Sequence, residues 1–164
     1  MLFRSTKNVE DEFYATYYNH VIINENDEYL TEKQVENGPI LVDFDFRYDG
    51  QTERKHNGDH ITDVMCLYAD ILKDAFIQFQ EGDEFTIYAM EKPNVNYLEN
   101  KNITKDGIHL LFTVRMNHYA QQLLRLVMID KIEDVFSKEE FDFANNWDSI
   151  LDEGISKEIG RAHV

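Results

Sequence analysis

The apolar run PILVDFDF at residues 39–46 contains two aspartates, and this combination limits what the chain can fold into. A Gly-Pro pair precedes the run, and its bulky apolar side chains predict a buried β-strand from about Pro39 to Phe46. Side chains two positions apart in a strand lie on one face, so Asp43 and Asp45 would share a face. Burying two unpaired carboxylates is strongly unfavourable. The fold must therefore supply a partner for them or leave their face to water.

Two interpretations of the aspartate pair stay open at this point. Mg²⁺ takes oxygen ligands and is often shared between one or two carboxylates and substrate phosphates, as in two-metal phosphoryl-transfer sites. In the other interpretation, the aspartates face water while Val42, Phe44 and Phe46 face the core, which is the ordinary alternation of a half-solvated strand. The pattern alone does not choose between them.

A second candidate segment is KDGIH at residues 105–109, which leads into a strand predicted from Ile108 to Val114. His109 would share a strand face with Gly107, and a glycine there leaves room for a ligand to approach the backbone. A histidine near metal-bound phosphates can donate to a phosphate oxygen or act as an acid. Taken alone, such a histidine is more often structural, and Lys105 alone indicates a solvated loop charge.

A third candidate is Asp152, which follows the apolar pair Ile150-Leu151 and could complete a metal site with a third carboxylate. Asp148 and Glu153 are rivals by position. The signal is weak by itself, because the chain holds 32 acidic residues.

The rest of the chain predicts mixed helices and strands, which places it in the α/β or α+β class. The expected elements are a short aromatic-faced helix around residues 13–18, a turn at Asp49-Gly50, a helix from Asp59 to Gln80 stopped by Gly82, a strand from Glu84 to Met90, a polar loop from Asn94 to Thr104, a helix from Asn117 to Phe136, and an amphipathic stretch from Phe141 to Leu151. In the second long helix, the periodicity places six apolar residues roughly on one side: Tyr119, Leu123, Leu126, Val127, Ile129 and, later, Ile132.

Composition bounds the class of protein. A chain of 164 residues with 43% hydrophobic residues predicts one globular domain over residues 1–164. No stretch approaches the roughly 20 apolar residues of a membrane span. The single cysteine, Cys66, lies on the apolar side of the first long helix, which indicates a buried thiol and a reducing, intracellular setting. His56 and His60 lie in polar contexts, and no P-loop, zinc-type spacing or serine nucleophile motif is present.

The net charge of −16 argues against a stand-alone nucleic-acid binder, which ordinarily carries a basic face to neutralise phosphates. Three explanations are compatible with it. The chain does not touch nucleic acid, or divalent metals and a few placed basic groups act locally, or basic partner domains lie outside this sequence.

The combination of motifs resembles the archaeo-eukaryotic primase superfamily, and in particular the primase–helicases of nucleocytoplasmic large DNA viruses, the poxvirus-like group. Residues 39–48 (PILVDFDFRY) resemble the first motif of that group, and residues 105–109 (KDGIH) resemble the second. Residues 88–93 (YAMEKP) are similar to its strand and Glu-Lys-Pro turn. The resemblance covers about Pro39 to Gly160, and the third motif, a hydrophobic residue followed by Asp152, is looser.

The resemblance implies a primase-type catalytic core, in which a mixed sheet carries the carboxylates and helices flank it. By the resemblance, Asp43 and Asp45 bind catalytic Mg²⁺ or Mn²⁺, and Asp152 is the third carboxylate. It also implies that His109 contacts the phosphates of the incoming nucleotide, with Lys105 and Arg47 as phosphate or template contacts. The implied reaction is two-metal nucleotidyl transfer, in which a 3′-hydroxyl attacks the α-phosphate of an NTP or dNTP.

The resemblance further implies a single-stranded DNA template and a role in making primers for viral DNA replication, in the cytoplasm of a host cell. The chain would be a piece of a longer primase–helicase whose helicase domain follows. Two alternatives remain. The same carboxylates could serve a metal-dependent nuclease, or the acidic chain could be a non-catalytic interaction or DNA-mimic module.

Overall fold

A computed structural model of the chain describes residues 7–26, 36–76 and 84–152. The chain divides into two compact units, Met1–Lys33 and Gln34–Val164, and each is described by itself. The single catalytic domain predicted over residues 1–164 therefore stays a prediction. Gln80, Gly82 and Glu153, which enter the sequence predictions, lie outside the described residues.

The first unit contains helix α1 (Lys7–Tyr18), which continues into one π-helical turn, η1 (Asn19–Ile23). Phe13 stacks on Tyr17 with ring centroids 6.0 Å apart and meets the edge of Tyr14 at 5.5 Å. The contact between Phe13 and Tyr17, four residues apart in the helix, confirms the predicted aromatic-faced helix.

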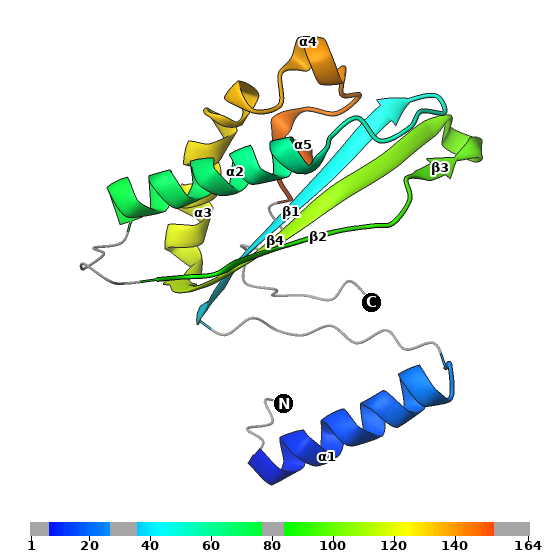
Figure 1. Ribbon diagram of the computed structural model, residues 1–164, viewed down its shortest axis with the longest axis vertical. Helices are drawn as coiled ribbons and strands as arrows, with labels where there is room; N and C mark the ends of the chain where they lie inside the picture. The colour runs from blue at the N-terminus through cyan, green and yellow to red at the C-terminus, as the bar shows by residue number, and fades with distance from the viewer. Residues whose placement is uncertain (1–6, 27–35, 77–83, 153–164) are drawn as a thin grey trace. The chain divides into compact units, whose positions relative to one another are not determined.

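The second unit is built on a four-stranded sheet with the order β1-β4-β2, in which β3 also pairs with β4 (Figure 1). The strands are β1 (Asn37–Asp49), β2 (Ile87–Glu91), β3 (Asn96–Leu98) and β4 (Ile103–Asn117). Each of their pairings is antiparallel. The α+β class is confirmed, and the sheet among the described residues is antiparallel where a mixed sheet was expected.

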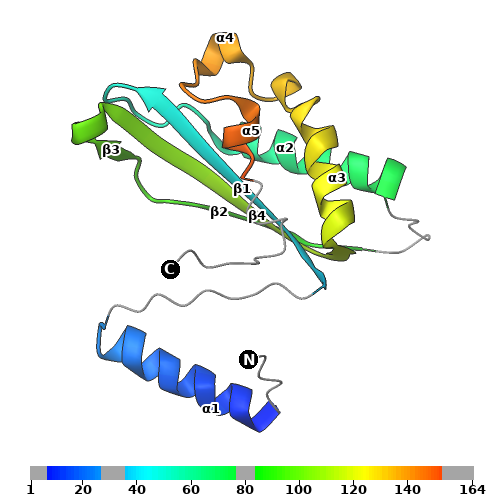
Figure 2. The same cartoon turned by 180° about the vertical axis from the view of Figure 1, so that it is seen from behind.

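Two helices of this unit, α2 (Gly58–Ile71) and α3 (His118–Ile129), lie on the same side of the sheet, as the opposite views of Figure 1 and Figure 2 both show. Helix α2 continues into a π-helical turn, η2 (Leu72–Phe76), and the remaining helical segments are single turns: η3 (Glu99–Lys101), η4 (Ile132–Asp134), α4 (Lys138–Phe141) and α5 (Trp147–Ile150). Among the described residues, no helix has the length and apolar character needed to cross a bilayer.

The core lies between these helices and one face of the sheet. Val42, Phe44 and Phe46 of β1 point into it and are almost completely buried, as are Ile108, Leu110 and Phe112 of β4. The alternating residues of both strands point to the opposite face, which we call the outer face of the sheet. Strand alternation therefore places Asp43 and Asp45 on the outer face.

Helix α2 begins at Gly58 because Asn57 caps it. The Asn57 Oδ1 accepts hydrogen bonds from the backbone N–H of Asp59 (2.9 Å) and His60 (3.2 Å), and the His60 ring accepts one from the Asn57 N–H (3.2 Å). This reciprocal cap satisfies otherwise unpaired donors of the first turn. It also fixes the connection between β1 and α2, which carries Arg54 and His56.

Several element boundaries differ from the sequence predictions. The expected polar loop over residues 94–104 contains β3 and η3, and the third strand runs fifteen residues in place of the predicted seven. The second long helix ends at Ile129, before Phe136. The turn at Asp49-Gly50 is confirmed, with Gly50 at a φ of +72° that favours glycine.

The apolar side predicted for the second long helix is only partly the side that faces the core. Val127 and Ile129 pack against the core and Ile132 is buried, but the other three members are exposed. Leu124 and Met128 face the core, whereas Tyr119 is 72% exposed and Leu123 and Leu126 are more than half exposed. The helix is apolar around most of its circumference, so periodicity alone could not select the buried stripe. The prediction for Cys66 was wrong, because its thiol is exposed on α2.

A substitution at Gly107 would test how closely the backbones of β1 and β4 approach each other. A Cβ atom at this position would overlap the backbone carbonyl oxygen of Phe44, far inside van der Waals contact, and backbone cannot move aside as a flexible side chain can. We expect Gly107→Ala to lower the free energy of unfolding by about 1–3 kcal/mol, measured by urea denaturation. Gly58→Ala is the matched control, because nothing lies within 4 Å of a Cβ there. Equal midpoints for the two variants would contradict the close approach.

Candidate active site

The antiparallel register of β1 and β4 brings the two sequence motifs face to face. Asp43 lies opposite His109, and Asp45 lies opposite Gly107. Arg47 lies opposite Lys105 two pairs further along. Directly opposed residues in a ladder project to the same face, so these side chains meet on the outer face of the sheet.

The side chains of this group line a cavity of about 430 Å³. The accessible charged and ionisable groups that line it are Asp43, Asp45 and Asp152 together with Arg47, Lys92, Lys105 and His109. Asp106 also borders the cavity, but its side chain is fully buried. The structure thus brings together all of the site residues predicted from the sequence. Acidic and basic groups are both present at the cavity, although the whole chain is strongly acidic.

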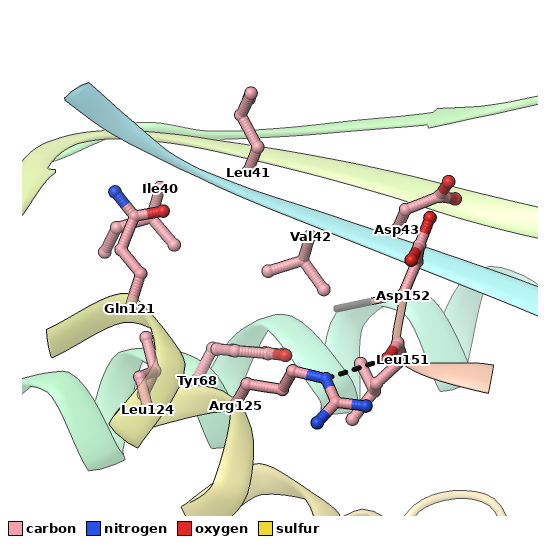
Figure 3. A pocket seen from close by; sticks show the side chains of 10 residues that line it. All are labelled: Ile40, Leu41, Val42, Asp43, Tyr68, Gln121, Leu124, Arg125, Leu151 and Asp152. Atoms are coloured by element: carbon pink, nitrogen blue, oxygen red, sulfur yellow. Dashed lines mark hydrogen bonds between the residues drawn. The ribbon is translucent and has the colours of Figure 1, made fainter. Parts of the chain in front are cut away.

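Asp152 reaches the cavity because the chain after α5 runs along the free edge of β1. Its backbone N–H donates to the Asp43 carbonyl oxygen at 3.0 Å, and Leu151 forms a β-bridge with Phe44. Figure 3 shows the Asp43 and Asp152 side chains next to each other. The guanidinium of Arg125 in α3 donates to the Leu151 carbonyl at 2.8 Å, which ties this segment to the helix layer (Figure 3).

The rival Asp148 does not line the cavity and is 74% exposed at its side chain, where it pairs with Arg125 at 3.3 Å. Glu153 lies outside the described residues. Among the described acids near the end of the chain, Asp152 is therefore the one placed beside Asp43.

The edge of β1 beyond Asp43 is held by residues 144 and 145. The Asn145 side chain donates to the Asp45 carbonyl at 2.8 Å and accepts from the Arg47 N–H at 3.1 Å. The Ala144 N–H donates to the Arg47 carbonyl at 2.7 Å. A side-chain amide thus takes the place of a neighbouring strand, and the backbone that carries the two aspartates is paired on both sides.

Asp43 is the most perturbed carboxyl of the site. Burial raises its pKa, and the charge of His109, whose Nδ1 lies 3.2 Å from Asp43 Oδ1, acts in the opposite direction. Repulsion from Asp152 and Asp45 raises the pKa further, and Lys92 lowers it. The result is a pKa above the usual aspartate value, so this carboxylate is crowded with like charge and incompletely neutralised.

Asp45 is more fully neutralised than Asp43. The guanidinium of Arg47 donates two hydrogen bonds to one of its carboxylate oxygens, at 2.7 and 3.1 Å. The ammonium of Lys105 lies 3.3 Å from the other oxygen. A cation that bound Asp45 would compete with both basic groups.

Sequence reasoning missed a buried charge cluster beneath the cavity. Arg54 donates to both oxygens of Asp106 at 2.9 Å, and this hydrogen bonding raises the pKa of Arg54. His56 lies beside the same carboxylate, with its Nδ1 3.5 Å from Asp106 Oδ2, and both side chains are 0% exposed. Glu91 completes the cluster by pairing with Arg54 and His56 at 3.0 Å each.

The signal for this cluster was present but hard to detect. Asp106 is one of the alternate residues of β4 that face the core, whereas its neighbours Lys105 and Gly107 face outward. His56 looked solvated because its sequence neighbours are polar, and its partners come from distant strands. Lys92 belongs to the YAMEKP string but had no role assigned to it.

The donor chemistry of the cavity suits a hard divalent cation, because Asp43, Asp45 and Asp152 offer carboxylate oxygens. The repulsion that raises the pKa of Asp43 is what such a cation would relieve. Within the part of the chain that the structure describes, no three His, Cys, Asp or Glu side chains are already arranged to hold one ion. The carboxylates present are therefore of the type that binds a divalent cation, but the side chains of Arg47 and Lys105 would have to move away from Asp45.

The raised pKa of Asp43 leads to a test of stability. The folded protein holds this proton more tightly than the unfolded chain, so ionisation of Asp43 reduces stability as the pH rises from about 4 toward neutral. We expect Asp43→Asn to have a higher melting temperature than the parent at pH 7 without metal, and the difference to shrink as the pH is lowered toward about 4. Asp70→Asn, at an exposed position of α2, should show no such trend. A destabilised Asp43→Asn at pH 7 would contradict the assignment.

A family model described as the C962R protein N-terminal AEP domain, where AEP denotes the archaeo-eukaryotic primases, matches residues 5–160. No curated protein matches the sequence. Because the family match spans nearly the whole chain, the predicted resemblance to the archaeo-eukaryotic primases is confirmed. The chain belongs to the family of C962R N-terminal archaeo-eukaryotic primase domains.

Proposed function

We propose that the second unit is the catalytic core of a DNA primase or primase-polymerase, which joins nucleotides on a template by metal-dependent nucleotidyl transfer. The observation that carries the proposal is the convergence of Asp43, Asp45 and Asp152 with His109 on one cavity of the outer face. Membership of a primase-domain family supports the same reaction class.

Asp43, Asp45 and Asp152 would hold Mg²⁺ or Mn²⁺ in this proposal. Bound divalent ions supply charge neutralisation at the reacting phosphate and a lower pKa for the attacking hydroxyl. The chain's own part is to fix the carboxylates on a paired strand, so that little reorganisation is needed when substrate binds.

His109 would contact a phosphate of the incoming nucleotide. Its Nδ1 faces Asp43, which fixes the orientation of the ring and leaves Nε2 for the substrate. Gly107, two residues earlier on the same face, presents no side chain, so a ligand can approach the strand between His109 and Lys105.

Arg47 and Lys105 would serve as phosphate or template contacts. Both now neutralise Asp45, and cation binding to that carboxylate would release them for an anionic substrate. This exchange addresses the difficulty raised by the net charge of −16, because basic groups line the cavity although the whole chain is acidic.

The substrates in this proposal are an NTP or dNTP and a single-stranded DNA template. The product would be primers for viral DNA replication in the host cytoplasm, and a helicase domain would accompany this domain in a longer protein. Membership of a primase-domain family supports nucleotide and nucleic-acid substrates in general.

The central test is metal-dependent nucleotide binding. We expect calorimetric titration with ATP and Mn²⁺ to show binding to the parent chain, and Asp43→Asn with Asp45→Asn to weaken it by more than about 100-fold. Asp63→Asn with Asp70→Asn is the matched control, because it removes the same charge from exposed positions of α2 and should bind like the parent.

Equal binding by the parent and the Asp43/Asp45 double variant would refute the assignment of the carboxylates. A primer-synthesis assay on single-stranded DNA then separates the alternatives. Incorporation of labelled nucleotide supports the primase, and cleavage of the DNA without incorporation indicates a nuclease. Binding to a basic partner, with no affinity for Mn²⁺ or ATP, would favour the acidic interaction module.

A further inference from the structure

The turn that follows β2 is held in place by one arginine. Arg54 Nη2 donates to the Lys92 carbonyl at 2.5 Å, and Arg54 Nη1 lies 3.0 Å from Glu91 Oε2. The Lys92 carbonyl and the carboxylate of the preceding residue, Glu91, are therefore bound to the same guanidinium. The β1–α2 connection, which carries Arg54, thereby fixes the position of Lys92.

Arg54 is itself held in place by the buried carboxylate of Asp106. Its bidentate pair with Asp106 joins it to β4, at the residue between Lys105 and Gly107. The Asp106 side chain is fully buried and that of Arg54 is 22% exposed, so the pair is shielded from water and resists displacement. His56 Nε2 lies 3.0 Å from the same oxygen of Glu91 that Arg54 contacts.

The side chain of Lys92 reaches the cavity that contains the carboxylates. It lines the cavity with Asp43, and its charge acts on the Asp43 carboxyl. Arg47 and Lys105 also line the cavity, but each lies within ion-pair distance of Asp45. Among the described residues, the ammonium of Lys92 has no carboxylate partner at ion-pair distance, so it can meet an anion without first breaking a pair.

We propose that Lys92 is a phosphate-binding residue of the site, which contacts the polyphosphate of the nucleotide, and that Arg54 is the positioning residue that holds it there. The proposal rests on the function proposed above, because the anion is taken to be a nucleoside triphosphate. An ammonium has three donors and a compact charge, which suits a phosphate group with several acceptor oxygens. Because the backbone of Lys92 is already fixed, only its side chain has to be ordered when the ligand binds.

The proposal predicts different effects on the binding of two ligands, ATP and Mn²⁺. Removing the Lys92 charge should weaken binding of an anionic nucleotide, but it should leave Mn²⁺ binding unchanged or tighter, because a cation beside Asp43 opposes a second cation. Damage to the fold would weaken both. The pair of measurements therefore separates a contact with phosphate from a structural role.

The experiment measures calorimetric Kd values for Mn²⁺ alone and for ATP in the presence of Mn²⁺, on the whole chain. We expect Lys92→Ala to weaken ATP binding by about 10–100-fold, the usual range for loss of a charge-assisted hydrogen bond. Lys92→Arg should stay within about threefold of the parent, since it keeps the charge and the donors. The control is Lys101→Ala, an exposed lysine on η3 that does not line the cavity.

Three results would overturn the proposal. Parental ATP binding by Lys92→Ala would show that Lys92 is a solvated surface charge, and the primase assignment would stand. A parallel loss of Mn²⁺ and ATP binding would show a structural role. Absence of ATP binding by the parent itself would remove the proposed function and this inference together.

The positioning role of Arg54 is tested by a double-mutant cycle with Lys92. Arg54→Lys should weaken ATP binding in the parent but have no further effect in the Lys92→Ala background, if it acts through Lys92. Equal losses in both backgrounds would overturn this part. Glu91→Gln, which preserves the Arg54–Asp106 pair, repeats the cycle if thermal unfolding shows that Arg54→Lys is not folded.

Discussion

The site depends above all on the antiparallel pairing of β1 with β4. One face of each strand is anchored in the core by residues such as Phe44, Phe46 and Ile108, which are 0% exposed. Because side chains alternate along a strand, this anchoring also dictates which residues reach the outer face. A slip of one residue would turn the aspartates into the core and expose the phenylalanines, so burial of apolar area selects the register that opposes Asp43 to His109.

Charge is distributed in two layers around this ladder. On the outer face, carboxylates crowd together and are neutralised unequally, which leaves Asp43 with a raised pKa and Asp45 with two basic partners. Below them, Arg54 and Asp106 form a shielded pair that connects β4 with the turn after β2. The outer layer has groups that can exchange partners, whereas the inner layer has groups whose separation would leave a charge buried and unpaired. The buried Arg54–Asp106 pair thus holds fixed the backbone beneath side chains that can exchange their ionic partners.

Much of this arrangement follows from local pattern. The apolar strand with Asp43 and Asp45, the strand with His109 and the long helix α2 were predictable, because each has a period that matches its secondary structure. The buried face of α3 was not predictable, because Tyr119 and Leu123 form an apolar stripe at helical spacing beside the one that contains Leu124. The Arg54–Asp106 pair was not predictable either, because its members lie 52 positions apart and meet only through tertiary structure. The local sequence shows periodicity, but it does not show which polar groups from distant parts of the chain will be buried together.

The segment from Ala144 to Asp152 brings the third carboxylate to the edge of β1 with one β-bridge and a few hydrogen bonds from Asn145, Ala144 and Asp152. Trp147, Ile150 and Leu151 of the same segment are buried in the core, so its attachment depends on apolar packing as well as on these hydrogen bonds. The three carboxylates therefore come from two stretches of the chain that are anchored in one core. A substitution that loosens the packing of Trp147 or Ile150 would displace Asp152 without changing any side chain that lines the cavity.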